Sequence, residues 1–357
     1  MRLLLLADGS SVHTQRYQAE MAGQGVEVIL ASLERGDTVD ILLKKKSVSN
    51  SLNYFFVNRQ IKDLVRKYSP DIINPHFASG YGFSTALSKV WKKYPVALHC
   101  LGSDILISPQ KSIAHKRRII YGLARSKMIF ADSDYLADEI NRLYKNSQIS
   151  VIPWGVESEI ADIYQSKIEN RFKFSKPLRI LVPRPHQKVY NNKFIIRALK
   201  DKINDKRIGL SFPDWGDFTD WFKKLANELC PDGLIDYYKF KPREEYITFL
   251  AGHDIYLSAS ISDSSPASLI EAMGAGLWPV AANIHGVREW LDNNNGNVFD
   301  LNEPESINRI FDKLLSSDFN PEKILTENHA RVMETAIFSK NISETIEIME
   351  RLIANGK

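Results

Sequence analysis

The sequence of 357 residues contains only two cysteines, Cys100 and Cys230, and neither has the spacing of a metal ligand. A disulfide framework and a zinc site of the usual pattern are therefore excluded, which is typical of a protein from a reducing compartment. No apolar run reaches the roughly 18 residues that a membrane-spanning helix needs. The apolar run at residues 3–6 is also too short for the core of a signal peptide. We expect a cytoplasmic protein whose first apolar segment is a buried strand.

Several common functional motifs are missing as well. The sequence has no internal repeat, no low-complexity segment, no Walker phosphate loop and no Gly-x-Ser-x-Gly motif. One Asp-x-Asp pattern, at residues 132–134, follows a strand-like segment and opens a helix-like one. Helix capping explains this pattern better than metal binding does. We therefore expect neither a metal nor a cofactor.

Positive charge is concentrated in one part of the chain. The net charge is +4, but residues 51–130 contain 13 basic and only 3 acidic residues. Such a region suits an anionic partner, although a solvated helix face gives the same pattern. Aromatic residues are interleaved with the cations, which favours the headgroup layer of an anionic membrane over nucleic acid. We expect a peripheral membrane contact and no nucleic-acid partner.

Short apolar segments alternate with longer amphipathic ones, which predicts parallel strands joined by helices. A polar, charged stretch at residues 161–177 interrupts this alternation, and the chain is long for a single core. We predict two doubly wound, Rossmann-like α/β domains, 1–165 and 166–335, with a hinge near 161–177. A C-terminal helix within 336–357 is expected to pack back across them. Ligands of such sheets bind at the carboxyl ends of the strands, so two facing domains would enclose a central cleft.

The most informative segment is SDSSPASLIEAMGAG, at residues 262–276. Ser265 is a good helix N-cap and Pro266 suits the first helical position. The amides and the dipole at such a helix start suit a phosphate. Glu271 would lie about 9 Å further along the helix, within reach of a ribose attached to that phosphate. Taken alone, the segment also fits a capped helix with a surface glutamate, but the small residues 272–276 indicate packing.

Here the chain resembles the retaining glycosyltransferases of family 4, the glycosyl transferases of group 1, which have the GT-B fold. The family pattern is an acidic residue, seven further residues, a glutamate, then Ala-Met and a strand with Pro-Val. The matching positions are Asp263, Glu271, residues 272–273 and residues 279–280. Asp263 stands where the family usually has glutamate. Residues 283–299, NIHGVREWLDNNNGNVF, resemble a run that closes the donor site in one branch of the family. The resemblance spans roughly residues 1–345.

The resemblance implies a site for a nucleotide-sugar donor. Arg184 and a lysine would bind the diphosphate; Lys188 lies closer to Arg184 in the sequence than Lys193 does. Glu271 would bind the ribose, and Asp263 and His99 would hold the sugar. The remaining donor contacts implied are Gly9, Ser10, Ser11, Phe240, Ser264, Ser265, Pro266, Ala267 and Ser268. The acceptor-side candidates are His13, Arg16 and Asp104.

The implied activity is transfer of a sugar, with retention, from a UDP- or GDP-sugar to a hydroxyl of a glycan or lipid-linked acceptor. Such an enzyme would act in cell-surface polysaccharide or glycolipid synthesis, at the inner face of the membrane. Two alternatives stay open. A nucleotide-sugar 2-epimerase has the same fold, but the extra catalytic carboxylates and histidines it needs are not recognisable in the sequence. A catalytically inactive nucleotide-sugar-binding protein is the other, because Asp263 replaces glutamate and a Lys-Gly pair common in the family is missing.

Overall fold

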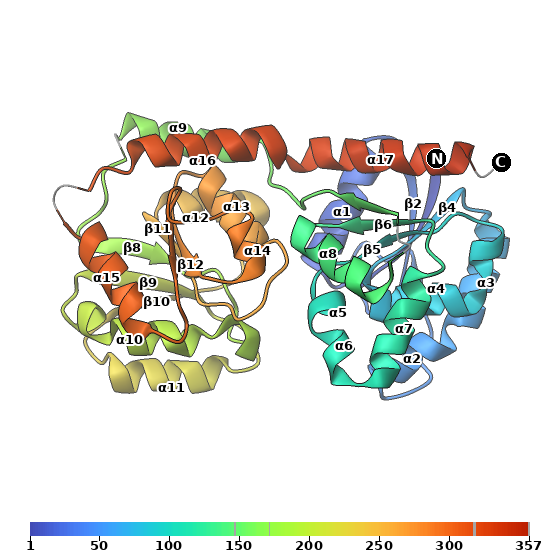
Figure 1. The fold of residues 1–357 in the computed structure, drawn as a ribbon, viewed down its shortest axis with the longest axis horizontal. Coiled ribbons are helices and arrows are strands. Elements are labelled where there is room, and N and C mark those ends of the chain that lie inside the picture. Colours follow the sequence, from blue (N-terminus) through green and yellow to red (C-terminus); the bar gives the residue numbers. More distant parts are fainter. Residues whose placement is uncertain (146–147, 171, 317–318, 356–357) are drawn as a thin grey trace. The chain divides into compact units, whose positions relative to one another are not determined.

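The computed structural model describes residues 1–145, 148–170, 172–316 and 319–355, which divide into two compact units. The first unit comprises Met1–Pro153 together with the C-terminal residues from Ser339 onward, and the second comprises Trp154–Phe338 (Figure 1). These borders differ from the expected ones at 165 and 335. Both units contain parallel sheets flanked by helices, so the predicted class of two Rossmann-like α/β domains is confirmed.

The first unit is built on parallel strands. A four-stranded sheet has the order β3-β2-β1-β4, and parallel bridges from β4 to β5 join it to a three-stranded sheet, β5-β6-β7. The leucines at positions 3–6 are fully buried, because both faces of the central strand are covered. The strands are β1 (Arg2–Leu6), β2 (Glu27–Ser32), β3 (Ile41–Leu42), β4 (Ile72–Pro75), β5 (Ala97–His99), β6 (Met128–Ala131) and β7 (Ile149–Val151).

Helices surround the sheets of this unit. Residue Val57 separates α2 from α3, and α5 to α7 lie between β5 and β6. The Asp-x-Asp pattern is a cap as expected, because the Ser133 hydroxyl accepts the amide of Leu136 at the start of α8. The helices are α1 (Val12–Gly23), α2 (Asn50–Phe56), α3 (Asn58–Tyr68), η1 (Phe77–Gly82), α4 (Phe83–Ser88), η2 (Val90–Lys92), α5 (Ser103–Leu106), α6 (Ser108–Lys111), α7 (Ile113–Leu123) and α8 (Asp134–Leu143).

The second unit contains a six-stranded parallel sheet with the order β10-β9-β8-β11-β12-β13. The chain starts at β8, proceeds outward to β10, and then crosses back to continue from β11. The order therefore reverses between β8 and β11, and this is the point where doubly wound sheets bind ligands. The strands are β8 (Leu178–Leu181), β9 (Ile208–Pro213), β10 (Leu234–Tyr238), β11 (Ile255–Ser258), β12 (Trp278–Ala282) and β13 (Asn297–Phe299).

Helices cover both faces of this sheet (Figure 1). On one face α10, α11 and α15 pack together; on the other α9, α12, α13 and α16 do. Two buried clusters, one for each face, hold the layers together. The helices are α9 (Ile160–Glu169), η3 (Lys188–Tyr190), α10 (Asn192–Asn204), α11 (Thr219–Leu229), α12 (Arg243–Ala251), α13 (Ala267–Gly274), α14 (His285–Arg288), α15 (Pro304–Leu314) and α16 (Glu322–Thr335).

The prediction of a hinge near 161–177 is wrong. Most of that stretch is α9, which buries Ile160, Ile163 and Tyr164 against the second unit. Asp162 and Glu169 are exposed, whereas Lys167 lies on the packed side and donates to the His253 carbonyl. The charged composition therefore suggested a linker although the apolar residues have helical spacing. Residue 171 lies outside the described residues.

The C-terminal helix α17 (Phe338–Ala354) enters the first unit at Ser339. Gln24, after α1, donates to the Ser339 carbonyl at 2.9 Å and accepts the Ser343 hydroxyl at 2.8 Å. Asn341 donates to the Pro153 carbonyl at 2.8 Å. The last two residues of the segment expected to pack back, 356–357, lie outside the described residues.

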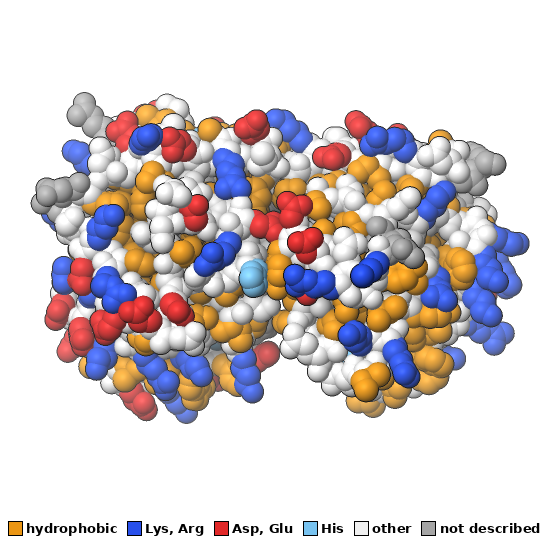
Figure 2. All heavy atoms as spheres, viewed as in Figure 1, with side chains coloured by type: hydrophobic (Ala, Val, Ile, Leu, Met, Phe, Trp, Pro, Cys, Tyr) orange, Lys and Arg blue, Asp and Glu red, His pale blue; other side chains and the backbone are white. Residues whose placement is uncertain are grey.

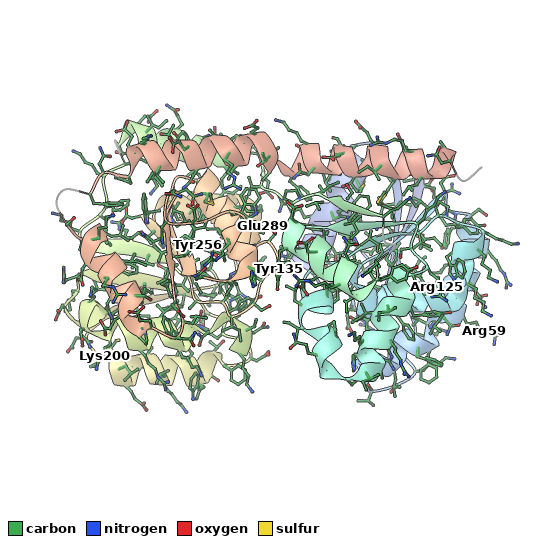
Figure 3. All side chains as sticks on the ribbon, viewed as in Figure 1. Arg59, Arg125, Tyr135, Lys200, Tyr256 and Glu289 are labelled. Atoms are coloured by element: carbon green, nitrogen blue, oxygen red, sulfur yellow. The ribbon has the colours of Figure 1, made fainter. Side chains whose placement is uncertain are left out.

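The basic region of residues 51–130 covers part of the first unit. Figure 2 shows Lys and Arg side chains gathered over the edge where Figure 1 places α3 and α4. Arg59 extends outward from α3 (Figure 3), whereas Ile61 and Val65 of the same helix are buried. In the described part of the chain, no helix is both long and apolar enough to cross a bilayer.

Candidate functional site

Arg184 and Asp263 meet at the point where the strand order of the second unit reverses. Arg184 follows β8 and Asp263 follows β11, and these two strands are neighbours in the sheet. The Nη2 atom of Arg184 lies 2.6 Å from Oδ2 of Asp263. Their side chains are only 12% and 19% exposed. The residue predicted to bind the diphosphate, Arg184, and the residue predicted to bind the sugar, Asp263, therefore form an ion pair with each other.

The charge of Arg184 is secured by its surroundings. Burial acts to lower the pKa of this guanidinium, but Asp263 and the neighbouring tyrosines outweigh burial and raise it above its ordinary value. The Tyr190 ring lies 5.3 Å from the guanidinium carbon, and the Arg184 carbonyl accepts the side-chain amide of Asn192 at 2.9 Å. Arg184 is thus a fixed cation, as the binding of a diphosphate requires.

The helix that follows Asp263, α13, begins one residue later than predicted, and no side chain caps it. Its N-cap position is Pro266, which has no side-chain cap, and the first internal hydrogen bond runs from the Leu269 amide to the Pro266 carbonyl. The prediction that Ser265 caps the helix is wrong. Its hydroxyl instead accepts the indole N–H of Trp290 at 3.2 Å. The amides of Ala267 and Ser268 form the first turn, beside the positive end of the helix dipole.

The run at 283–299 has a structural role around this helix start. A Cβ atom at Gly286 would lie 2.3 Å from the carbonyl oxygens of Asp263 and Ser264. Only glycine therefore lets α14 approach this backbone so closely. Together with the bond from Trp290 to Ser265, this contact fixes the segment that presents Asp263.

Glu271 lies on α13 and is buried, with 9% of its side chain exposed. It is not the surface residue of a simple capped helix. Arg243, at the start of α12, places Nη2 2.7 Å from Oε1 of Glu271 and also forms an ion pair with Glu157. Burial raises the pKa of Tyr238, and the negative charge of Glu271 raises it further. Neither Arg243 nor Glu157 was singled out in the sequence, because no local pattern connects them with Glu271.

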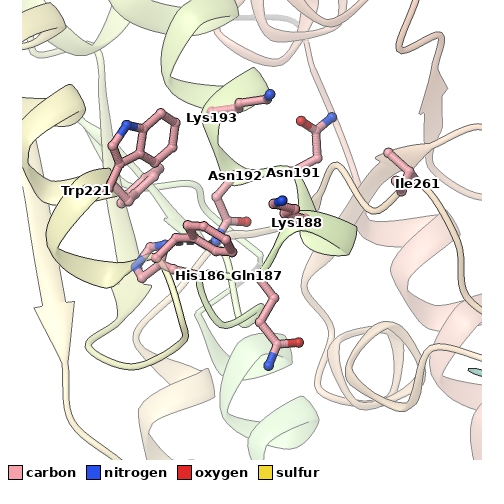
Figure 4. A pocket seen from close by; sticks show the side chains of 10 residues that line it. His186, Gln187, Lys188, Asn191, Asn192, Lys193, Trp221 and Ile261 are labelled. Carbon is pink, nitrogen blue, oxygen red and sulfur yellow. Dashed lines mark hydrogen bonds between the residues drawn. The ribbon is translucent and has the colours of Figure 1, made fainter.

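Both lysine candidates line a pocket of about 460 Å³ in the second unit. Lys188 and Lys193 are exposed and lie between Trp221 and Ile261 in Figure 4. The ammonium of Lys188 is 5.5 Å from the Phe218 ring. The pocket adjoins the ion-pair site, since Asn192, which lines the pocket, donates to the Arg184 carbonyl at 2.9 Å. Both lysines therefore present an exposed cation at a pocket beside the ion pair.

Exposed aromatic residues lie at the carboxyl end of β10, among them Phe240, which the resemblance implied as a donor contact. Phe240 is 66% exposed, and its ring centroid is 6.2 Å from that of Trp215. Trp215 in turn packs edge-on against Tyr238 at 5.5 Å. An exposed aromatic pair of this kind offers a stacking surface to a planar ring.

In the first unit, the protein's own packing accounts for Gly9. A Cβ at this position would lie 2.1 Å from a methyl carbon of Val39, and the Gly9 amide donates to the Ser32 hydroxyl at 2.9 Å. The glycine therefore lets the first loop pack against residues 32–39. Nothing in this contact supplies the approach to a phosphate that the resemblance implied.

The neighbouring residues of the first loop are held by Asp8. The amide and the hydroxyl of Ser10 both donate to Oδ1 of Asp8, at 2.9 and 2.7 Å. Ser11 is the N-cap residue of α1, without a side-chain cap bond. His13 and Arg16 follow on that helix; His13 is exposed and Arg16 is half-buried.

His99 ends β5 and is buried, with its ring stacked on Phe130 at 4.6 Å. The Asn74 side-chain nitrogen donates to the Ala97 carbonyl and lies 2.9 Å from Nδ1 of His99. Since the second amide hydrogen is also a donor, Nδ1 accepts and Nε2 carries the proton. Burial, and then the neighbouring His76, lowers the pKa of His99 well below its ordinary value. His99 is thus a neutral donor, which suits a sugar hydroxyl.

Asp104 has a structural environment. It is buried, Oδ2 accepts the Ala78 amide at 2.6 Å and Oδ1 accepts the Leu101 amide at 3.1 Å. Burial raises its pKa to about 6, against the effect of these hydrogen bonds. The carboxylate ties η1 to α5 and does not face outward toward an acceptor.

The described ranges contain no group of three or more His, Cys, Asp or Glu side chains that could hold a metal ion. Both cysteines are free and buried. The charged groups at the site are therefore arginines, lysines and carboxylates.

Solved structures with a similar architecture identify the fold. Sucrose-phosphate synthase from Thermosynechococcus elongatus is similar with a TM-score of 0.79 at 10% identity, covering 99% of this chain and 100% of that one. HepE from Anabaena, in a complex with UDP and glucose, has a TM-score of 0.79 at 14% identity, covering 98% and 99%. At these identities the likeness concerns the fold, which is GT-B.

Two family models match the sequence. Residues 2–133 match the model described as glycosyl transferase 4-like, and residues 165–332 match glycosyl transferases group 1. The uncharacterized glycosyltransferase MJ1178 of Methanocaldococcus jannaschii is 26% identical over 316 residues, which is 87% of this chain and 83% of that protein. Both models describe glycosyltransferases, and the second matches residues 165–332 to the glycosyl transferases of group 1.

Proposed function

We propose that the protein is a retaining family 4 glycosyltransferase that transfers a sugar from a UDP- or GDP-sugar to a hydroxyl of a glycan or lipid-linked acceptor. The observation that carries the proposal is the ion pair of Arg184 and Asp263 beside the start of α13, with Glu271 further along the same helix. The relative HepE, crystallised with UDP and with UDP-glucose, supports a nucleotide-sugar donor.

In this proposal the donor diphosphate lies against the first turn of α13. The amides of Ala267 and Ser268 and the guanidinium of Arg184 bind its oxygens, because helix starts and arginine forks both suit phosphate. Lys188 extends from the adjoining pocket to the same group. Glu271 accepts hydrogen bonds from the ribose hydroxyls, and the aromatic pair of Phe240 and Trp215 receives the base.

The sugar is bound by Asp263 in the second unit, and His99 in the first unit stays a separate prediction of a sugar ligand. No side chain is assigned as a general base. The leaving phosphate oxygen accepts the proton of the acceptor hydroxyl on the same face of the sugar, so the configuration is retained. Positioning and the cationic charge of Arg184 and Lys188 supply the catalysis. The configuration of the transferred sugar, read by proton NMR of the product, tests retention.

The membrane part of the proposal rests on the first unit, where α2 and α7 adjoin. Arg118 on α7 donates to the Ser51 hydroxyl on α2 at 2.6 Å. Phe55 on α2 is 48% exposed and Ile113 on α7 is 73% exposed, among the basic residues of region 51–130. Exposed apolar groups with surrounding cations are typical of peripheral binding to anionic lipid. Co-sedimentation with anionic but not zwitterionic vesicles tests this part, and it would place the enzyme in cell-surface polysaccharide or glycolipid synthesis.

Calorimetric titration with UDP and GDP tests the donor site. The wild type is expected to bind one of the two, and Arg184→Gln to bind it about 10- to 100-fold more weakly, because a charge-assisted hydrogen bond is lost. Lys323→Gln removes an 86% exposed cation of the same unit and serves as the control. The proposal fails when the wild type binds neither nucleotide, or when Arg184→Gln binds as well as the control.

A further inference from the structure

Arg243 is the one charged partner that the structure gives to the buried carboxylate of Glu271 among the described ion pairs. It stands at the first position of α12, directly after the loop that follows β10. One of its nitrogens, Nη2, lies 2.7 Å from Oε1 of Glu271 and also pairs with Glu157. The exposed fractions of these side chains are 9% for Glu271, 20% for Glu157 and 32% for Arg243. All three residues belong to the second unit.

The two carboxylates in this cluster stabilise the charged form of Arg243. Burial acts to lower the pKa of Arg243, but the pairing with Glu271 and Glu157 outweighs it and raises the pKa above its ordinary value. Arg243 therefore remains a cation. Removing it would leave the carboxylate of Glu271 buried without its counter-charge, which is strongly unfavourable. The orientation of Glu271 thus depends on Arg243.

We propose that Arg243 is a positioning residue for nucleotide recognition, and that Glu157 fixes Arg243 in turn. This inference rests on the proposed function, in which Glu271 binds the ribose. An ionised carboxylate accepts several hydrogen bonds, so Glu271 can be held by Arg243 and still accept from the two ribose hydroxyls. A site built to bind hydroxyls discriminates strongly against a ligand without them. Arg243 should therefore determine how well the enzyme distinguishes a ribonucleotide from its dideoxy form.

The test compares UDP and GDP with their 2′,3′-dideoxy forms by calorimetry. For the wild type we expect the ribonucleotide that binds to be favoured over its dideoxy form by about 10- to 100-fold. In Arg243→Gln the affinity for the ribonucleotide should fall by about 10-fold, while that for the dideoxy form changes by less than about 2-fold. The ratio of the two affinities should then approach one. A role confined to folding would not change this ratio.

Two further variants guard against loss of folding. Arg243→Lys keeps the charge but places a differently shaped and positioned donor group near the two carboxylates, so it should retain part of the discrimination. Glu157→Gln keeps Arg243 itself and should reduce the ratio in the same direction. Arg309→Gln, which breaks an exposed ion pair with Glu303, is the matched control and should keep the wild-type ratio. An unchanged ratio in all the Arg243 and Glu157 variants would overturn the inference, as would an equal loss of affinity for both forms.

Glu271→Gln separates this inference from the one on which it rests. When Glu271→Gln loses the discrimination and Arg243→Gln keeps it, Glu271 binds the ribose without help from Arg243, and only the present inference fails. When Glu271→Gln keeps the discrimination, or the wild type binds neither ribonucleotide, the ribose assignment fails and the role of Arg243 fails with it.

Discussion

Among single residues, Gly286 shows how closely the backbone constrains the site. The position where its Cβ would lie is occupied by the carbonyl oxygens of Asp263 and Ser264, 2.3 Å away. One of these oxygens belongs to Asp263, whose carboxylate pairs with Arg184. Gly286 therefore packs directly against the backbone that carries Asp263.

Gly286→Ala should destabilise the protein by about 1–3 kcal/mol, because the added methyl group overpacks a rigid backbone contact. The same change should weaken binding of the nucleotide-sugar, since Asp263, the proposed sugar ligand, is displaced. Gly252→Ala is the matched control: a Cβ there meets only the Phe249 carbonyl at 3.4 Å. Urea unfolding and calorimetry measure both effects. Equal stability of the two variants would show that α14 yields freely and that this account of Gly286 is wrong.

The sequence indicated some of these residues and could not indicate others. Arg184, Asp263 and Glu271 stand in recognisable patterns, since strand ends and a helix start leave marks in the sequence. Arg243 and Glu157 do not, because their ion pairs join segments distant along the chain. The choice of Ser265 as a cap followed a sound local rule, but the indole of Trp290 competes for its hydroxyl, and this is a tertiary contact.

On the scale of elements, α9 illustrates how composition can mislead. Its charged residues suggested a linker, yet Ile160 is fully buried against α12, α13 and α16. Helix α16 is also rich in charge, yet it buries Leu325 and Val332 on one face while its charged side chains are exposed on another. The strands were easier to predict, because they are short, apolar and covered on both sides. Amphipathic helices rich in charge carry a weaker signal, and α9 was taken for a hinge for this reason.

Ile160→Ala tests the packing of α9. Truncating a fully buried isoleucine should lower the free energy of unfolding by about 2–5 kcal/mol. Ile168→Ala, on the same helix but 39% exposed, should change it by less than about 1 kcal/mol. Denaturant unfolding followed by circular dichroism measures both. Similar small effects in the two variants would mean that the stretch behaves as the flexible hinge first predicted.

For the molecule as a whole, buried histidines determine how stability depends on pH. Burial lowers the pKa of His76 to about 3, and those of His186 and His253 to about 4. In the unfolded chain these rings titrate near their ordinary value of 6.5. Below that pH the unfolded state binds protons that the folded state does not, so the stabilisation present above pH 6.5 is lost as the pH falls toward 4.

We predict that the free energy of unfolding falls by roughly 5 kcal/mol between pH 7.5 and pH 5. Asp104 acts in the opposite direction, because burial raises its pKa to about 6 and its ionisation above that pH is unfavourable in the folded state. The buried histidines, which include His99, outweigh this one carboxyl group. Urea titrations at the two pH values measure the change, and His76→Asn should flatten it. Equal or greater stability at pH 5 would contradict this account.

The measurement that bears most directly on the proposed donor site is hydrogen–deuterium exchange with and without UDP and GDP. The account predicts that the nucleotide that binds slows exchange in the peptides covering residues 184–190 and 264–272, where Arg184 and the first turn of α13 lie. It also predicts that Glu271→Gln reduces this protection at the same nucleotide concentration. Protection confined to the first unit, or none at either segment with a nucleotide that binds, would contradict the placement of the donor.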